Sequence, residues 1–202
     1  GMPLQLRVFE PRYGAMLSSL LSGTEREFGV VLIERGSEVG GGDVRFAVGT
    51  VARIVSVEVS EGSIHLLANG ATRFEVLRWL QDDPFPRAEV RELAAVEFDG
   101  STPEALAEVE ALVRGTLARA SEFVELPWPA DVELSPELGD RIWQVAGIAP
   151  LSSIDQYALL CSTTASELLT RLVDETQGAE IVLTAGWGSG SADGGGGEGA
   201  AG

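Results

Sequence analysis

The chain has 202 residues, of which 45% are hydrophobic and 22% charged, a composition typical of globular proteins that bury a core. Its formal net charge of −17 disfavours nucleic acid and anionic membranes as partners, because their phosphates are bound mainly through lysine and arginine. No apolar run approaches the roughly 20 residues that span a bilayer and no signal peptide is visible, so we expect a cytoplasmic protein.

All 14 basic residues are arginines, and the absence of lysine excludes a Schiff base, a Ser-Lys dyad and a phosphate-loop lysine. His65 is the only histidine, so a Ser-His-Asp triad would have to use it and a metal site would consist mainly of carboxylates. Cys161 is the only cysteine and reads as a small core residue. We therefore predict no catalytic residues, no metal and no cofactor.

The chain begins with an alternation of apolar and polar residues that predicts a half-buried strand over residues 4–8. At Pro11 the spacing becomes helical, which predicts a helix that begins there and ends at Gly23. Where the strand gives way to the helix, we expect Arg12 to form an ion pair with Glu10. The segment LQLRVFEPRYGAML is thus interpreted as a strand-to-helix corner.

The next part of the chain, up to about residue 93, is rich in strand signals. Glu61-Gly62 and Asn69-Gly70 are both interpreted as hairpin turns, because these dipeptides tolerate positive φ. Short strands joined by tight turns indicate a small barrel or a strongly curved sheet. The predicted strands cover residues 28–33, 46–59, 64–68, 71–80 and 87–93.

The pattern changes to helical spacing near residue 100. A helix capped by Ser101 or Thr102 should be followed by one that starts at Ser135-Pro136, and two later capping boxes predict two more helices, the last running to about Val182. The capping boxes pair Ser152 with Asp155 and Thr164 with Glu167. The glycine-rich stretch after them cannot bury enough apolar surface to order itself, which predicts a flexible tail.

Two features invite a chemical interpretation that we do not favour. The glycine run at residues 40–42 lies between two predicted strands, without the helix and the lysine of a phosphate loop, so a plain connection is favoured. His65 follows Ile64 in a predicted strand, and neither Ser60 nor Ser63 can be shown to lie within reach, so a structural histidine is favoured over a general base.

Three aromatic residues are the candidate peptide-binding residues. Trp79 is predicted on the strand face opposite Val76 and Leu80, Phe85 lies between two prolines, and Trp128 stands in Pro-Trp-Pro. Aromatic side chains on stiff loops suit protein or peptide contacts, although packing between the two halves of the chain is the stronger interpretation for each.

The order of motifs resembles the N-terminal, substrate-binding domain of Lon proteases and free-standing bacterial LON-domain proteins. The resemblance covers about residues 3–184, and Phe9, Glu10, Pro11, Arg12 and Tyr13 form its structural signature. It implies an α+β fold, with a PUA-like curved sheet or pseudo-barrel followed by a helical bundle. It also implies recognition of unfolded or damaged polypeptide rather than its cleavage. The motifs that carry the resemblance are LRVFEPRYGAML, FGVVLI, VGTVARIVSVEV, HLLANGATRFEVL, PFPRAEVREL and LSSIDQYALLCSTTASELLTRLVDE.

From this resemblance we expect a β-rich part over residues 1–98, a helical bundle over 99–184 and a disordered tail over 185–202. We interpret the chain as a stand-alone protein that binds polypeptide segments and delivers them to proteolysis. An apolar cleft between the two parts is the expected site. The alternatives are a hydrolase or a small-molecule-binding module that uses the same cleft.

Family members usually carry one more apolar strand before the segment that begins here at Met2. Its absence predicts an exposed sheet edge near residues 4–8, and an unpaired edge invites formation of a homodimer.

Overall fold

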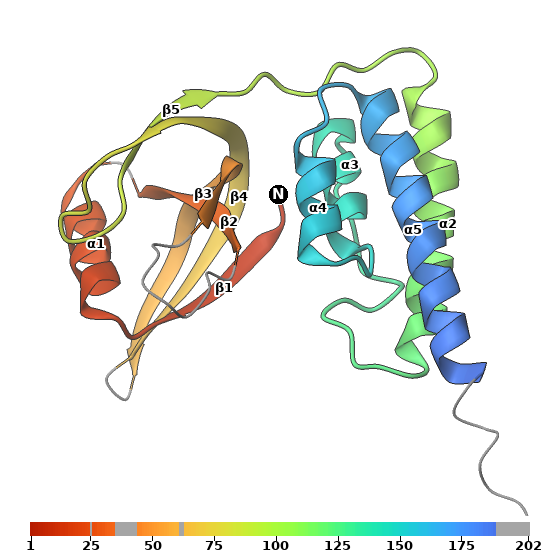
Figure 1. Ribbon diagram of the computed structural model, residues 1–202, viewed down its shortest axis with the longest axis horizontal. Helices are drawn as coiled ribbons and strands as arrows, with labels where there is room; N and C mark the ends of the chain where they lie inside the picture. The colour runs from red at the N-terminus through yellow and green to blue at the C-terminus, as the bar shows by residue number, and fades with distance from the viewer. Residues whose placement is uncertain (25, 35–43, 61–62, 189–202) are drawn as a thin grey trace, which may run out of the picture.

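The structure, a computed structural model, describes residues 1–24, 26–34, 44–60 and 63–188, with side chains up to residue 180. Its N-terminal part is a five-stranded antiparallel sheet in which β1, β4, β3 and β2 follow one another, while β5 pairs with the far end of β4. The sheet is strongly curved, and α1 lies along one of its sides (Figure 1). The strands are β1 (Pro3–Val8), β2 (Glu27–Glu34), β3 (Val44–Ser60), β4 (Ser63–Trp79) and β5 (Ala88–Glu92).

The helix α1 (Pro11–Ser22) begins and ends as its sequence predicts. Pro11 occupies the first turn, where a missing N–H costs nothing, and the backbone N–H of Gly23 closes the other end on the Leu20 carbonyl. The expected ion pair between Arg12 and Glu10 is present, with 2.8 Å between Nε and Oε2. The strand-to-helix corner is confirmed.

One predicted turn is wrong: Asn69-Gly70 does not end a strand, because β4 runs through it. Asn69 pairs with Pro3 of β1 on one side and with Arg53 of β3 on the other. Gly70 continues the ladder opposite Ala52, next to an irregularity in β3. The dipeptide thus lies where the long strand pair changes register, and pairing on both sides overrides its turn propensity. Glu61-Gly62, the other predicted turn, and residues 40–42 lie outside the described residues.

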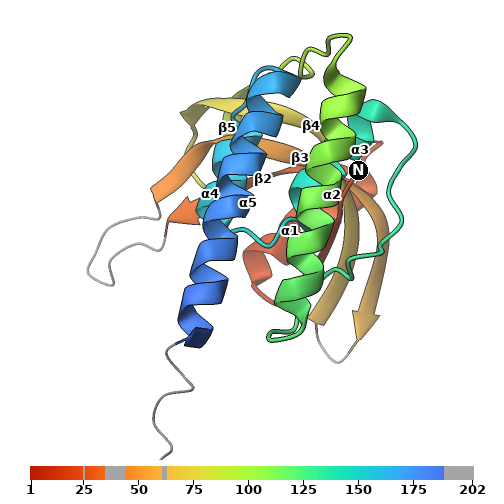
Figure 2. The ribbon, with the colours of Figure 1, turned by 90° about the vertical axis from the view of Figure 1, so that its right-hand side faces the viewer.

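The C-terminal part is a bundle of the four predicted helices (Figure 2). Its core includes Val113, Ile142, Val145, Leu168 and Leu172, none of which exposes any surface. The third helix of the chain begins at Leu138 rather than at the predicted Ser135-Pro136, and the last continues to Gly188, beyond the predicted end. The remaining part of the predicted tail lies outside the described residues. The helices are α2 (Thr102–Ser121), α3 (Leu138–Ile148), α4 (Ser153–Leu160) and α5 (Ala165–Gly188).

Side-chain hydrogen bonds hold the starts of α2, α4 and α5. The Asp155 N–H donates to Ser152 Oγ, and the Glu167 N–H to Thr164 Oγ1, each over 3.2 Å, so both capping boxes are confirmed at their N-cap residues. At α2 the sequence pointed to Ser101 or Thr102, but Asp99 is the group that accepts hydrogen bonds there, from the Ser101 N–H and from both hydroxyls. These bonds hold the pKa of Asp99 below its ordinary value.

A cluster of three charged side chains ties α2 to α3. Glu110 accepts hydrogen bonds from Arg114, one turn further along α2, and from Arg141 of α3. Burial alone would raise the pKa of Glu110, but the bonds from Arg141 and Arg114 outweigh it and hold the pKa below its usual value. Arg114 also donates to the carbonyls of Ala130 and Val132, which fixes the loop between the two helices.

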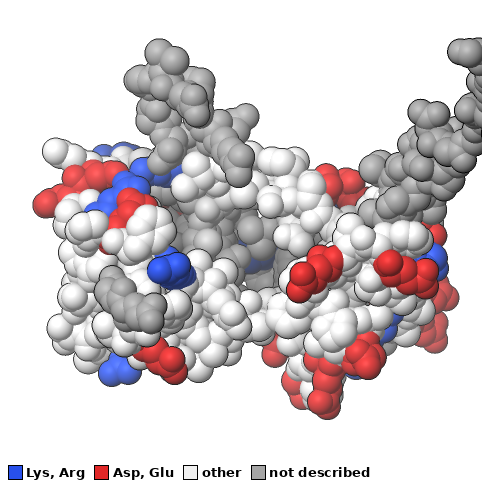
Figure 3. Space-filling view, turned by 90° about the horizontal axis from the view of Figure 1, so that it is seen from below, with Lys and Arg blue, Asp and Glu red and all other residues white. Residues whose placement is uncertain are grey.

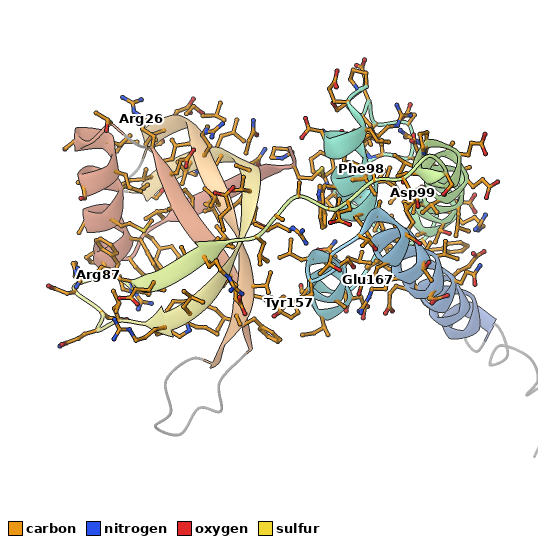
Figure 4. The ribbon with its side chains drawn as sticks, turned by 90° about the horizontal axis from the view of Figure 1, so that it is seen from above. Arg26, Arg87, Phe98, Asp99, Tyr157 and Glu167 are labelled. Carbon is orange, nitrogen blue, oxygen red and sulfur yellow. The ribbon has the colours of Figure 1, made fainter. Side chains whose placement is uncertain are left out.

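The β part and the helical part meet at a closed junction. Arg73 of β4 is 8% exposed and donates to the carbonyls of Leu160, the last residue of α4, and of Ser162, and also to that of Ala94 in the linker. Nearby, Tyr157 of α4 extends toward the sheet (Figure 4), and its ring centroid lies 4.5 Å from that of Phe46. Burial, with a hydrogen bond to Cys161, raises the pKa of Tyr157.

Candidate functional site

The curled sheet encloses an open cavity of about 680 Å³. This volume lies within the range of about 300–1,000 Å³ that ligand pockets occupy. Its walls are mostly apolar, and α1 contributes Tyr13 and Met16 to them. The sheet provides Leu66, Phe74, Val76, Ala88 and Val90, among others.

Phe74 lies across two glycines on the neighbouring strands. Gly49 is its direct partner in β3, and Gly29 lies in β2. A β-carbon at Gly49 would lie 2.5 Å from Phe74 Cζ, and one at Gly29 would lie 2.9 Å from the same atom. Only glycine therefore leaves room for the ring, which is 5% exposed and packs flat against the sheet.

Three of the four charged side chains that line the cavity, Glu10, Glu27 and Arg45, have partners of opposite charge, whereas Arg7 forms no ion pair with any described residue. Arg45 lies 4.7 Å from the ring centroid of Trp79 and 3.4 Å from a carboxylate oxygen of Asp82. Glu27 accepts from Arg53 of β3 over 2.7 Å. Because the walls are mostly apolar and three of the four charged side chains are paired, the space that remains favours an apolar guest.

The structure separates the three candidate aromatic residues. Trp79 lines the cavity of the β part, whereas Trp128 lines a second cavity of about 250 Å³ inside the helical part. Phe85 lines neither of these two. These two cavities lie one in each part of the chain, and Arg73, Tyr157 and Phe46 make contacts at the junction between the parts.

The predicted orientation of Trp79 is wrong. Simple alternation places it on the strand face opposite Val76, yet both residues line the cavity. The pairing of β4 with β5 shifts its register between Val76 and Arg78, which is the effect of an extra residue in the strand. This irregularity turns Trp79 toward the cavity, and a two-residue period cannot anticipate it.

The signature stretch, interpreted as architecture alone, also contributes to this site. Phe9, Glu10 and Tyr13 all line the cavity, and Phe9 is 75% exposed at its mouth. The sequence signal that could have placed Phe9 at the site is its position as an apolar residue directly before the polar corner. Pro11 and Arg12 keep the architectural roles described above.

Arg73 and Trp143 are the junction residues that the sequence did not reveal. The partners of Arg73 lie 87 and 89 residues further along the chain, beyond the reach of any local pattern. Trp143 could not be singled out from the sequence, because it follows Ile142 in a segment with apolar residues at helical spacing.

Ser63 and His65, the residues that the alternative hydrolase would use, are in contact. Ser63 Oγ lies 3.2 Å from His65 Nε2, but the same hydroxyl donates to the Ser60 carbonyl. Within the described residues no carboxylate is hydrogen-bonded to His65, and neither residue lines the cavity. Ser63 is also buried, so this pair lacks both an orienting group and an open approach. The described part of the chain holds no group of three His, Cys, Asp or Glu side chains placed to bind a metal.

The fold of this chain, a curved antiparallel sheet joined to a helical bundle, matches that of solved N-terminal domains of Lon proteins. Among solved structures, the chain is similar to the Lon N-terminal domain protein of Xanthomonas campestris (24% identity, TM-score 0.59, 86% of this chain and 89% of that one). It is also similar to the N-terminal domain of the Mycobacterium avium complex Lon protease (20% identity, TM-score 0.57, 88% and 90%).

The chain belongs to the family of the ATP-dependent protease La (LON) substrate-binding domain, whose model matches residues 1–177. It is 28% identical over 133 residues to the Lon protease of Rhizobium meliloti, a match that spans 65% of this chain and 14% of that protein. The region shared with Lon is therefore the substrate-binding domain and not the protease domain. No helix in the described part is long and apolar enough to cross a membrane.

Proposed function

We propose that this chain recognises unfolded or damaged polypeptide segments without cleaving them, and that these segments bind in the cavity of the β part. The observation that carries the proposal is an open, apolar cavity of about 680 Å³ in a domain of the LON substrate-binding family. In folded proteins large apolar side chains are buried, so an apolar cavity selects segments that have lost their fold.

The expected binding affinity follows from the apolar side chains that line the cavity. Removing one leucine- or phenylalanine-sized side chain from water is worth about 1.5–3 kcal/mol. One such contact gives weak binding, because association also costs translational and rotational freedom. Two or three anchors in the same cavity would contribute about 3–9 kcal/mol before that cost, which gives a weak, reversible complex suited to a module that samples many clients. Of the three aromatic candidates, we propose Trp79 as the anchor on the protein side, with Phe85 and Trp128 as residues to be tested beside it.

The proposal includes the cellular setting. We propose a cytoplasmic adaptor that passes bound segments to a protease, and a protein that does not bind nucleic acid or membranes. The charge distribution supports the last point: residues 99–202 carry seventeen carboxylates against four arginines. Among the charged side chains visible over the helical part, the acidic ones form the larger patches (Figure 3). A homodimer through the free edge of β1 remains part of the proposal.

A second candidate is a binding module for a small apolar molecule, favoured by the same cavity volume. The polypeptide-binding and the small-molecule-binding proposals differ in the length of the ligand. A small molecule would be enclosed by the walls, whereas a polypeptide must enter and leave through the mouth beside Phe9.

The experiment measures binding of a fluorescently labelled, reduced and carboxymethylated model protein by fluorescence anisotropy. Two matched pairs of variants locate the site: Trp79→Ala against Trp128→Ala, and the exposed Phe9→Ala against Phe98→Ala, an exposed residue of the linker (Figure 4). Trp79→Ala and Phe9→Ala should weaken binding about tenfold, the equivalent of about 1.4 kcal/mol, and the other member of each pair less than about threefold. Absence of binding by the unaltered protein would overturn the proposal.

A further inference from the structure

The two outer strands of the sheet each have one free edge. In the strand order β1-β4-β3-β2, β1 pairs only with β4 and β2 only with β3, as far as the described residues extend. In an antiparallel pair, alternate backbone N–H and C=O groups point away from the partner strand. Both strands therefore present a row of backbone donors and acceptors that no described strand uses.

The cavity opens between these two edges. Strands β4 and β5 line it with residues of one face, such as Phe74 and Val76, or Ala88 and Val90. By contrast, residues 6–10 and 27–31 line it without a gap. Successive side chains of a strand point to opposite faces, so an unbroken run means that the backbone edge itself borders the cavity.

The edge of β2 lacks the usual protection against strand pairing. Edge strands are normally guarded by charged residues or proline within the strand. In β2, the six residues 28–33 (FGVVLI) are uncharged and contain no proline, and charges stand only at the two ends.

We infer that the bound polypeptide pairs as an added strand with the free edge of β2, and that every second one of its side chains enters the cavity. This inference rests on the proposed function and adds how the segment is recognised. The row of backbone groups on β2 matches only another extended backbone, while the cavity beside it accepts apolar side chains at a spacing of two. The clients are extended segments of about five to seven residues with alternating apolar side chains and no proline.

The test uses backbone methylation, which removes hydrogen-bond donors and keeps the side chains. The probe is a nine-residue labelled peptide in which valine alternates with serine, compared with two versions that are N-methylated on all the valines or on all the serines. Only every second residue of an added strand faces the receiving edge. One methylated version should therefore bind at least about tenfold more weakly, and the other within about threefold of the parent peptide.

The outcomes separate the two proposals. If the parent peptide binds and both methylated versions bind equally well, the added strand is wrong and the proposed function stands. Equal weakening by both methylations also contradicts pairing with the single edge of β2. If neither the parent peptide nor the unfolded model protein binds, both proposals fail.

Hydrogen exchange identifies which sheet edge is paired on binding and whether a peptide or a second copy of the chain occupies it. Peptide binding should slow exchange of amides in residues 27–34 at least about tenfold, with smaller changes in α2 and α5. A protein that is already dimeric, and whose β2 amides are protected without peptide, would overturn the inference in favour of a second copy of the chain. Protection confined to β1 would overturn it as well.

Discussion

The guanidinium carbon of Arg73, in β4, lies 4.9 Å from the ring centroid of Trp143, in α3. A single cationic side chain thereby joins the sheet to the helical bundle by stacking, while its N–H groups satisfy three backbone carbonyls. Burial lowers the pKa of Arg73, and the nearby Cys161 acts against this shift. The orientation of the cavity relative to the bundle depends on this contact.

Arg73→Lys should destabilise the protein even though it keeps the charge. A lysine cannot reproduce the planar stacking or reach the three carbonyls at once, so we expect a loss of at least about 2 kcal/mol in the free energy of unfolding. The matched control is Arg78→Lys, an exposed arginine of the same strand that pairs with Glu89, for which we expect less than about 0.5 kcal/mol. Urea denaturation measures both. Equal stability of the two variants would show that the junction does not depend on Arg73.

Gly49→Ala should distort the cavity. The new β-carbon would meet Phe74 and the Val30 carbonyl, and such overpacking costs about 1–3 kcal/mol. Gly14→Ala is the control, because nothing lies within 4 Å of its β-carbon position in α1, and alanine there should stabilise the helix by about 0.5–1 kcal/mol. Thermal unfolding should give shifts of opposite sign, and a shift of the same sign in both variants would contradict the packing described for Phe74.

Glu110 should make stability depend on pH in the acid range. Its pKa is lower in the folded than in the unfolded state, so its contribution is complete above the unfolded pKa, about 4.3, and is lost as the pH falls through the lower folded value. Glu110→Gln should cost about 1.5–3 kcal/mol at pH 7, and this deficit should shrink below about pH 4. Glu108→Gln, an exposed position on the same helix, is the control. A deficit that does not change between pH 7 and pH 3 would contradict this role.

The acidic helical part should favour basic clients. For two peptides with the same apolar core but flanks of opposite charge, the basic one should associate about tenfold faster at low salt. The difference should narrow at about 0.5 M NaCl, where screening shortens the range of the field. Stopped-flow fluorescence measures both rates. Rates that do not depend on the sign of the flanks would contradict long-range attraction by the helical part.

The helices and most strands could be predicted from the sequence because their signals are local. Pro11 and Gly23 bound α1, Ser152 and Thr164 cap their helices, and the alternation of residues 4–8 defines β1. The resemblance supplied the arrangement of these elements and the family. The failures have a common cause: Asn69-Gly70 and Trp79 both lie beside register shifts, where pairing with another strand decides the geometry.

The candidate site was predicted less well than the fold. Trp79 was selected for its exposure, but its place in the cavity depends on the irregularity after Val76. The contacts at the junction of the two parts could not be predicted, because pairs such as Arg73 and Leu160 are distant in the sequence. Phe9 was assigned to architecture because an apolar residue before a polar corner is compatible both with a role in the corner and with a place in the wall of a cavity.

The central claim is that polypeptide binds in the cavity of the β part. The most direct measurement is photo-crosslinking of a peptide that carries a benzophenone in place of one apolar side chain, followed by identification of the modified residues by mass spectrometry. The account predicts crosslinks within residues 6–10, 27–33 and 74–90, which surround the cavity, and their loss in Trp79→Ala and Phe9→Ala. Crosslinks concentrated within residues 117–156, around the cavity of the helical part, would contradict it.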